Sequence, residues 1–143
     1  MPATDNHSST NADSTERLRA LVARLADDDL QRSLGGGWTT AFALAHLAFW
    51  DARQVAALKR FARGDQFPAE DLATNDALEL IAAAFDPATI GEAAVNAAQD
   101  LDQIVTTLTA DQLNDLRTSG KAYAIDRAPH RDEHISQIEE ALR

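Results

Sequence analysis

The sequence predicts an all-α protein, an antiparallel four-helix bundle. Apolar residues recur at spacings of three and four over four long stretches, which is typical of amphipathic helices. Segments containing glycine or proline separate these stretches, and no strand-like alternation of apolar and polar residues is visible. A chain of 143 residues suffices for one domain with a real core. Four such helices pack most simply as an antiparallel bundle.

Residues 1–13 are small and polar, rich in Ser, Thr, Asn and Asp. Such a segment buries too little apolar area to offset the entropy lost on ordering. We therefore expect a flexible tail, with His7 exposed in it, followed by a single helical domain over residues 14–143.

The first helix is predicted over residues 14–34, with Ser14 or Thr15 as its N-cap. Leucines recur along it at helical spacing. Three consecutive glycines, Gly35–Gly37, should end it because glycine is a strong helix breaker.

The second helix should follow Trp38, with Thr39 or Thr40 as its cap, and should run to about Arg63 before Gly64. Apolar residues lie on most of its sides, which predicts the central helix of the bundle.

Residues 65–75 contain a proline and predict a loop. A short helix is expected over residues 75–85, with Leu78, Ile81 and Ala82 facing inward.

The third long helix should begin at Asp86-Pro87, a cap followed by a first-turn proline, and reach about Leu108. Its apolar spacing is that of a bundle helix. A short capped turn is expected at residues 109–113. The fourth long helix is predicted over residues 126–142, with Asp126 as N-cap and Pro129 in the first turn.

Charge and composition narrow the function classes. The formal net charge is −10 and the chain lacks the clustered Lys and Arg that a phosphate backbone requires, so we expect neither a nucleic-acid nor a membrane partner. The longest apolar stretch, residues 42–50, is too short to span a bilayer. The N-terminus does not resemble a secretory signal, and we expect a cytoplasmic protein. Because there is no cysteine, any metal must be held by nitrogen and oxygen.

Three histidines form the candidate site. His46 lies in a strongly apolar helix, and His130 and His134 lie four residues apart on one helix face. Each feature alone has an ordinary explanation, a hydrogen-bonded core histidine or a solvated pair. The charged residues 131–133 indicate that the last helix has a solvent-facing side. Together, on two inward stripes, the three imidazoles predict a metal site with an open position, which favours chemistry or ligand binding.

Other polar residues are weaker candidates. Gln137 could orient a ligand or substrate, or simply pack on the helix. Arg53 could hold an anionic substrate group, although a salt bridge is the simpler interpretation. Asp51, Asp132 and Glu133 are weak candidates for a general base and are expected to be mostly solvated. The catalytic group itself, a metal-bound water or thiol, is not assigned to a side chain.

Two sequence segments carry a family resemblance. Gly37-Trp38-Thr39 precedes Ala43-Leu44-Ala45-His46-Leu47, and the last helix reads His130-xxx-His134-xx-Gln137-Ile138. This pattern resembles the DinB/YfiT-like four-helix bundle superfamily over nearly the whole chain after the tail. The resemblance implies a divalent metal, zinc or nickel most often, held by His46, His130 and His134.

Known members of that superfamily conjugate or isomerise electrophiles with a low-molecular-weight thiol such as bacillithiol or mycothiol, and others are metal-dependent hydrolases. We therefore expect a small-molecule substrate and either thiol transfer or hydrolysis. The alternatives are a non-enzymatic bundle that binds a small ligand, and a stress-associated homodimer with a structural metal.

Overall fold

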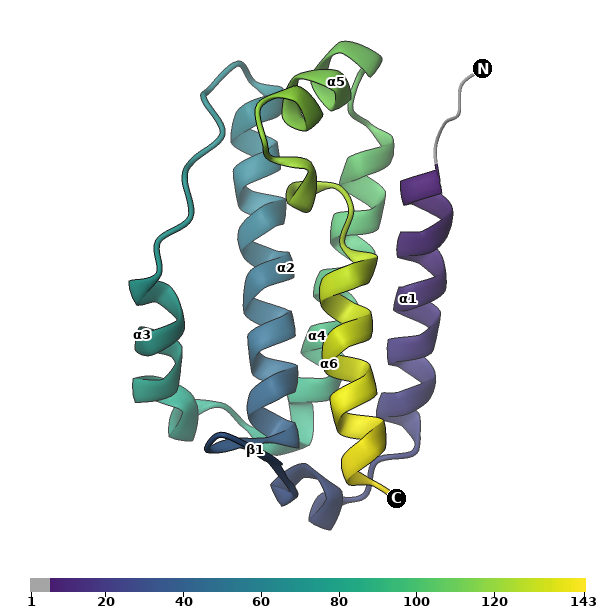
Figure 1. The fold of residues 1–143 in the computed structure, drawn as a ribbon, viewed down its shortest axis with the longest axis vertical. Coiled ribbons are helices and arrows are strands. Elements are labelled where there is room, and N and C mark those ends of the chain that lie inside the picture. The colour runs from purple at the N-terminus through teal and green to yellow at the C-terminus, as the bar shows by residue number, and fades with distance from the viewer. Residues whose placement is uncertain (1–5) are drawn as a thin grey trace.

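The structure, a computed structural model, describes residues 6–143. Its long helices lie side by side along the length of the molecule (Figure 1). They are α1 (Asn6–Ala23), α2 (Thr40–Ala62), α4 (Pro87–Thr106) and α6 (Ala128–Ala141). Helices α4 and α6 each pack against both α1 and α2. The predicted all-α class is confirmed. No helix in residues 6–143 is long and apolar enough to cross a membrane.

Two apolar clusters fill the space between these helices. The first lies among α1, α2, α4 and α6, and the second lies where the last turns of α2 and α4 meet α5 (Ala110–Thr118). The fully buried members of the two clusters include Leu18, Leu44, Leu47, Ala94, Ile135 and Ile138 in the first, and Leu58, Leu101, Ala124 and Ile125 in the second. Burial of these side chains supplies the main driving force for packing.

Local capping explains where α2 and α4 begin. The hydroxyl of Thr39 accepts a hydrogen bond from the Phe42 amide at 3.1 Å, as predicted for the N-cap of α2. The carboxylate of Asp86 accepts from the Ala88 amide at 2.9 Å, and Pro87 occupies the first turn of α4. These side chains satisfy amides that have no partner within the helix.

The predicted flexible tail is wrong for residues 6–13, which form the first turns of α1. Asn11 is only 1% exposed and His7 only 5%, and the His7 ring lies 2.8 Å from the guanidinium of Arg117 on α5. Composition misled the prediction because these polar side chains find partners on distant helices instead of water. Residues 1–5, the remainder of the predicted tail, lie outside the described residues.

The first helix also ends earlier than predicted. After Ala23 the chain forms a short 3-10 helix, η1 (Asp27–Gln31), and a two-stranded hairpin of β1 (Ser33–Gly35) and β2 (Trp38–Thr39). The hairpin corrects the expectation of no strand. The glycines therefore do not end a helix as predicted; Gly35, Gly36 and Gly37, with positive φ from 61° to 91°, instead form the turn of the hairpin.

The connections carry short helices: α3 (Ala73–Ile81), η2 (Ala82–Ala84), α5 and η3 (Ala122–Ala124). Leu78 is buried as predicted, but Ile81 is 54% exposed, so its inward orientation was wrong. The capped turn after Thr109 extends into the nine residues of α5.

The last helix also differs at its start, because α6 begins at Ala128 and Asp126 does not cap it. Asn11 of α1 takes this role, since its Oδ1 accepts from the amides of Arg127 at 2.9 Å and Ala128 at 3.1 Å. Pro129 lies in the first turn, as predicted.

Candidate metal centre

The three predicted histidines converge. His46 comes from the second turn of α2, and His130 and His134 come from the first two turns of α6. One ring nitrogen from each lies within 4.8 Å of the others, and the Nε2 atoms of His46 and His130 are 3.0 Å apart. His46 and His134 are buried, and His130 is partly exposed. The helix spacing therefore places three imidazoles around one point.

This donor set fits a divalent transition metal. Zinc–nitrogen bonds of about 2.0–2.1 Å in tetrahedral geometry place the ligand nitrogens about 3.4 Å apart. The 3.0 Å separation between His46 and His130 and the upper limit of 4.8 Å for all three nitrogens bracket that value. Imidazole suits zinc, copper, iron and nickel. Among residues 6–143 three protein nitrogens converge, so a tetrahedral ion held by them would keep one position for a water or a substrate.

His134 is oriented by the residue predicted for that role. Its Nδ1 lies 2.9 Å from Oε1 of Gln137, one turn further along α6. An amide oxygen only accepts, so Nδ1 donates and Nε2 keeps its lone pair for a metal. Trp38 stacks on the same ring, with centroids 5.6 Å apart and planes at 24°. The contacts support an orienting role for Gln137.

His46 is held by packing on both sides. The rings of Trp38 and Trp50 lie 5.0 Å and 6.5 Å from its ring. Burial lowers the pKa of His46 to about 4, and the nearby His134 and Arg127 contribute to the shift. Its Nδ1 is buried and has no hydrogen-bond partner within residues 6–143. The ring is therefore neutral at pH 7 and binds a cation without first releasing a proton.

His130 contacts a cation that the sequence analysis did not single out. Arg127 donates a hydrogen bond from Nη2 to Nδ1 of His130, at 3.1 Å. Burial first, and the charge of Arg127 second, lower the pKa of His130 to about 2. His130 is consequently neutral as well.

Arg127 belongs to a buried charged network. Asp51 of α2 accepts from Nε of Arg127 at 2.8 Å and from Nε of Arg131 at 2.9 Å, and Arg131 also donates to Asp102 of α4 at 2.8 Å. Asp51 is only 1% exposed and Arg131 is fully buried. Buried charges persist when they are paired in this way. The network fixes α6, and with it two of the histidines, relative to α2.

The network corrects two predictions. Asp51 is not solvated, and residue 131 does not belong to a solvent-facing side of α6. Arg131 lies four and seven residues before the inward-facing Ile135 and Ile138, which was the one available signal of its burial. By contrast, Glu133 is exposed, as predicted. Asp132 forms an ion pair with Arg17 at 3.1 Å, on the outside of the molecule.

The simpler interpretation of Arg53, a salt bridge, is wrong within the described residues. Its guanidinium donates to the backbone oxygens of Pro68 at 3.2 Å and Ala69 at 2.9 Å and to Oε1 of Gln54 at 3.0 Å, and it lies over the Trp50 ring. Among the described residues it forms no ion pair. Arg53 therefore fastens the loop after α2 onto that helix.

Two depressions, each of about 260 Å³, reach the histidines from different sides. The first, which we call the histidine pocket, is lined by His46, Trp50, Glu70, Asn75, Tyr123, Arg127 and His130. The second is lined by the β1–β2 hairpin with Trp38, His134 and Gln137. In the histidine pocket, Trp50 donates from Nε1 to Oδ1 of Asn75 at 2.8 Å, which fixes one wall. The imidazoles are thus accessible to small molecules.

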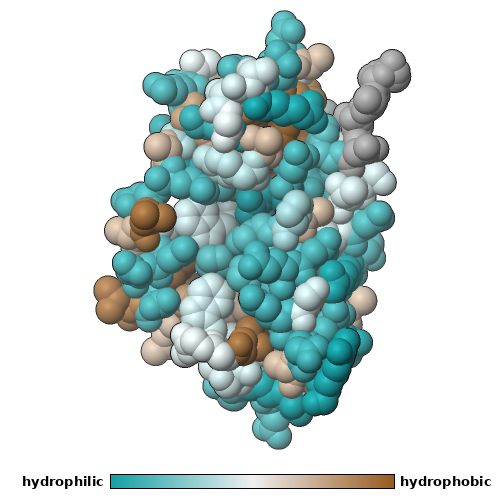
Figure 2. Space-filling view, in the orientation of Figure 1, coloured by the Kyte–Doolittle hydropathy of each residue, from teal (hydrophilic) through white to brown (hydrophobic). Residues whose placement is uncertain are grey.

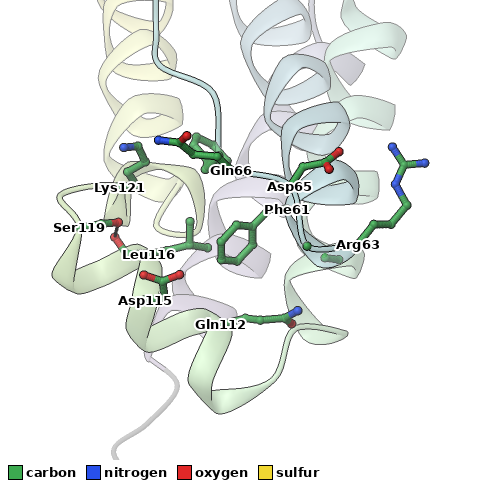
Figure 3. A pocket seen from close by; sticks show the side chains of 12 residues that line it. Phe61, Arg63, Asp65, Gln66, Gln112, Asp115, Leu116, Ser119 and Lys121 are labelled. Atoms are coloured by element: carbon green, nitrogen blue, oxygen red, sulfur yellow. Dashed lines mark hydrogen bonds between the residues drawn. The ribbon is translucent and has the colours of Figure 1, made fainter.

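A larger depression of about 730 Å³ lies at the other end of α2, away from the histidines. The last turn of α2, the loop after it and α5 form its walls, with Phe61 and Leu116 at its centre and Asp65, Asp115 and Lys121 around them (Figure 3). No histidine lines it. The chemistry expected of the imidazoles therefore belongs to the smaller pockets.

Comparison with known families agrees with this geometry. The family model of the DinB superfamily matches residues 12–134, and the chain belongs to that superfamily. No curated protein and no solved structure matched the chain. The match begins within α1 and ends at His134 in α6, so it covers all three histidines and the charged network.

Proposed function

We propose that the protein is a divalent-metal-dependent enzyme with a DinB-type four-helix bundle, acting on small electrophilic molecules by thiol transfer or hydrolysis. His46, His130 and His134 would hold the metal, with zinc or nickel as the expected ion. One observation carries the proposal: three imidazole nitrogens from two helices lie within 4.8 Å of one another beside two pockets.

The bound metal would supply Lewis acidity, which makes a water or a low-molecular-weight thiol nucleophilic near neutral pH. The chain's own residues prepare the site for it. Burial keeps His46 and His130 neutral, so that neither ring carries a positive charge that would repel the ion. Gln137 directs Nε2 of His134 into the site, and Trp38 and Trp50 shield the imidazoles from bulk water.

Metal content tests the site directly. Protein purified without an affinity tag and supplied with zinc should retain about one ion per chain after dialysis. His134→Ala should lose that ion, because two remaining imidazoles hold it far more weakly. His7→Ala is the matched control, since His7 lies against α5, away from the site, and this variant should keep the ion. Equal zinc content in His134→Ala and the unmodified chain would refute the proposed site.

Turnover distinguishes the two reactions. The metal-bound protein is incubated with an epoxide or an unsaturated carbonyl compound and a low-molecular-weight thiol, and thiol loss is followed; ester hydrolysis is followed in parallel without thiol. Activity that disappears with chelator and returns with metal supports an enzyme. Binding of these compounds without turnover supports the alternative, a non-enzymatic ligand-binding bundle.

One surface feature favours a homodimer as an additional proposal. Leu72 and Leu80, at the start and near the end of α3, are 91% and 86% exposed, and Ile81 is exposed beside them. Apolar groups stand out along the α3 edge of the molecule (Figure 2). Sedimentation of the unmodified chain against Leu72→Ser/Leu80→Ser tests this surface, because only a dimer through α3 would become monomeric.

A cytoplasmic location is also part of the proposal, and fractionation of cells tests it.

A further inference from the structure

The hydrogen bonds of Arg127 determine which ring nitrogen of His130 carries the proton. A guanidinium only donates, so Nδ1 of His130 must accept from Nη2 of Arg127. The proton of the neutral ring is then on Nε2, which donates to Nε2 of His46 at 3.0 Å. His46 in turn carries its proton on Nδ1, the atom that is buried without a partner. The metal-free arrangement therefore satisfies both ring nitrogens of His130 and leaves Nδ1–H of His46 without an acceptor among the described residues.

Binding a metal through Nε2 of His130 conflicts with this arrangement. A histidine bound in that way carries its remaining proton on Nδ1 and normally donates it to a carboxylate, a carbonyl or a water. Here the neighbour of Nδ1 is an N–H group of Arg127. Two donors would face each other, and a buried donor without an acceptor is costly. The metal-bound site needs an acceptor that Arg127 and His130 share, and a water in the pocket can fill this role until a substrate replaces it.

Among the described residues, the nearby carboxylates already accept hydrogen bonds from other groups. Asp51 already accepts from Nε of Arg127 and from Arg131, behind the guanidinium. Glu70, the carboxylate that lines the histidine pocket, is exposed and accepts from Gln54 at 3.0 Å. Meanwhile Asp51 and the backbone oxygen of Tyr123, at 2.8 Å and 2.9 Å, fix the plane of the Arg127 guanidinium. Its Nη2 is thus a rigidly held donor at the wall of the pocket.

We propose that a carboxylate of the substrate is the shared acceptor, so that the substrate is a small carboxylate-bearing molecule bound in the histidine pocket. This inference rests on the proposed function. One carboxylate oxygen would accept from Nη2 of Arg127 and the other from Nδ1–H of His130, a pairing suited to the planar guanidinium. Trp50 and Tyr123 provide walls for the carbon skeleton. The volume, about 260 Å³, limits the skeleton to a size below that of drug-like ligands.

The position of Glu70 further limits the class of carboxylate that the pocket can bind. Glu70 lines the same pocket as Arg127, and no ion pair within the described residues neutralises its negative charge. A second anionic group on the substrate would meet this charge. The site therefore favours a single carboxylate over a dicarboxylate, and Arg127 replaces Arg53 as the anion-binding residue.

Binding of model compounds to the zinc-bound chain tests the inference. Propionate should bind at least about tenfold more tightly than propionamide, its neutral analogue, as measured by calorimetry. Arg127→Lys keeps a positive charge beside Asp51 but loses the planar fork, and it should reduce this preference about tenfold. Arg53→Lys is the matched control and should retain the preference. An unchanged preference in Arg127→Lys would mean that the carboxylate binds elsewhere, for example on the metal alone, and would overturn the inference.

A second measurement uses the unmodified chain and does not depend on the folding of a variant. The nitrogen-15 chemical shifts of the His130 ring should show the Nε2–H form without metal and the Nδ1–H form with zinc. An Nδ1–H form without metal would overturn the inference, as would equal affinities for propionate and propionamide. Failure of the unmodified chain to bind zinc is a different result, which refutes the proposed function itself and removes the need for a shared acceptor.

Discussion

Replacing Asn11 by alanine should destabilise the protein strongly, although Asn11 lies in a segment whose composition suggested disorder. Its side chain makes three buried hydrogen bonds. Oδ1 accepts from the amides of Arg127 and Ala128, at 2.9 Å and 3.1 Å, and Nδ2 donates to the backbone oxygen of Ile125 at 2.7 Å. A residue of α1 thus caps the N-terminus of α6 from across the molecule.

The magnitude follows from these contacts. Loss of an N-cap side chain costs about 1–2 kcal/mol. The carbonyl of Ile125, a fully buried residue, loses its partner, which adds about 1–3 kcal/mol. Alanine is a better helix former than asparagine within α1 and returns about 0.5 kcal/mol. Asn11→Ala should therefore lower the free energy of unfolding by about 2–4 kcal/mol, a large share of the roughly 5–15 kcal/mol of a typical domain.

Urea denaturation of the metal-free protein, followed by circular dichroism, measures this loss. Asn96→Ala, on an exposed position of α4, is the matched control and should change the stability by less than about 0.5 kcal/mol. If Asn11→Ala were equally mild, the first turns of α1 would not be docked on α6, and the capping argument would fail.

Three further changes probe packing, charge and pH in the same urea assay. Gly91→Ala should cost about 1–3 kcal/mol, because its new Cβ would lie 2.7 Å from Cγ1 of Val22, and Val22→Ala in the same chain should recover most of the loss; no recovery would place the strain elsewhere. Asp51→Asn should cost about 3–5 kcal/mol, because it leaves the buried Arg127 without a carboxylate and Arg131 with Asp102 alone, whereas the exposed Asp100→Asn should be nearly neutral. In the metal-free protein, the pKa of His46 is about 4 when folded and 6.5 when unfolded. As the pH falls from 6.5 to 5, the imidazole is therefore protonated in the unfolded chain and stays neutral in the folded one. Stability should therefore be constant above pH 6.5 and fall by about 2 kcal/mol between pH 6.5 and 5 from this residue; a flat profile would contradict the burial of a neutral imidazole.

The parts of the fold that the sequence predicted well are those decided by neighbouring residues. Thr39 caps α2 because its partner lies three residues away, and His130 and His134 share a face because they lie four residues apart. The convergence with His46 followed from the two inward stripes. Each of these patterns involves residues a few positions apart and depends little on the rest of the chain.

The errors concern polar residues whose partners are distant in sequence. The local sequence around Asn11 predicts a tail residue, because its hydrogen-bond partner at the start of α6 lies 116 residues further along the chain. Asp51 and Arg131 were predicted to be solvated, because the ion pair that buries them joins two helices and residues 80 positions apart. Whether a charged or amide side chain is buried depends on such partners, and a local pattern does not contain them. The contact of Arg127 with His130 depends on the same buried network.

The metal ligands also have a topological consequence. His46 and His130 are separated by 84 residues, so an ion bound by both would close most of the chain into a loop. Such an ion would act as a removable cross-link between the second helix and the last one. Because the histidine pocket opens onto both His46 and His130, a chelator could remove such an ion while α6 stays docked.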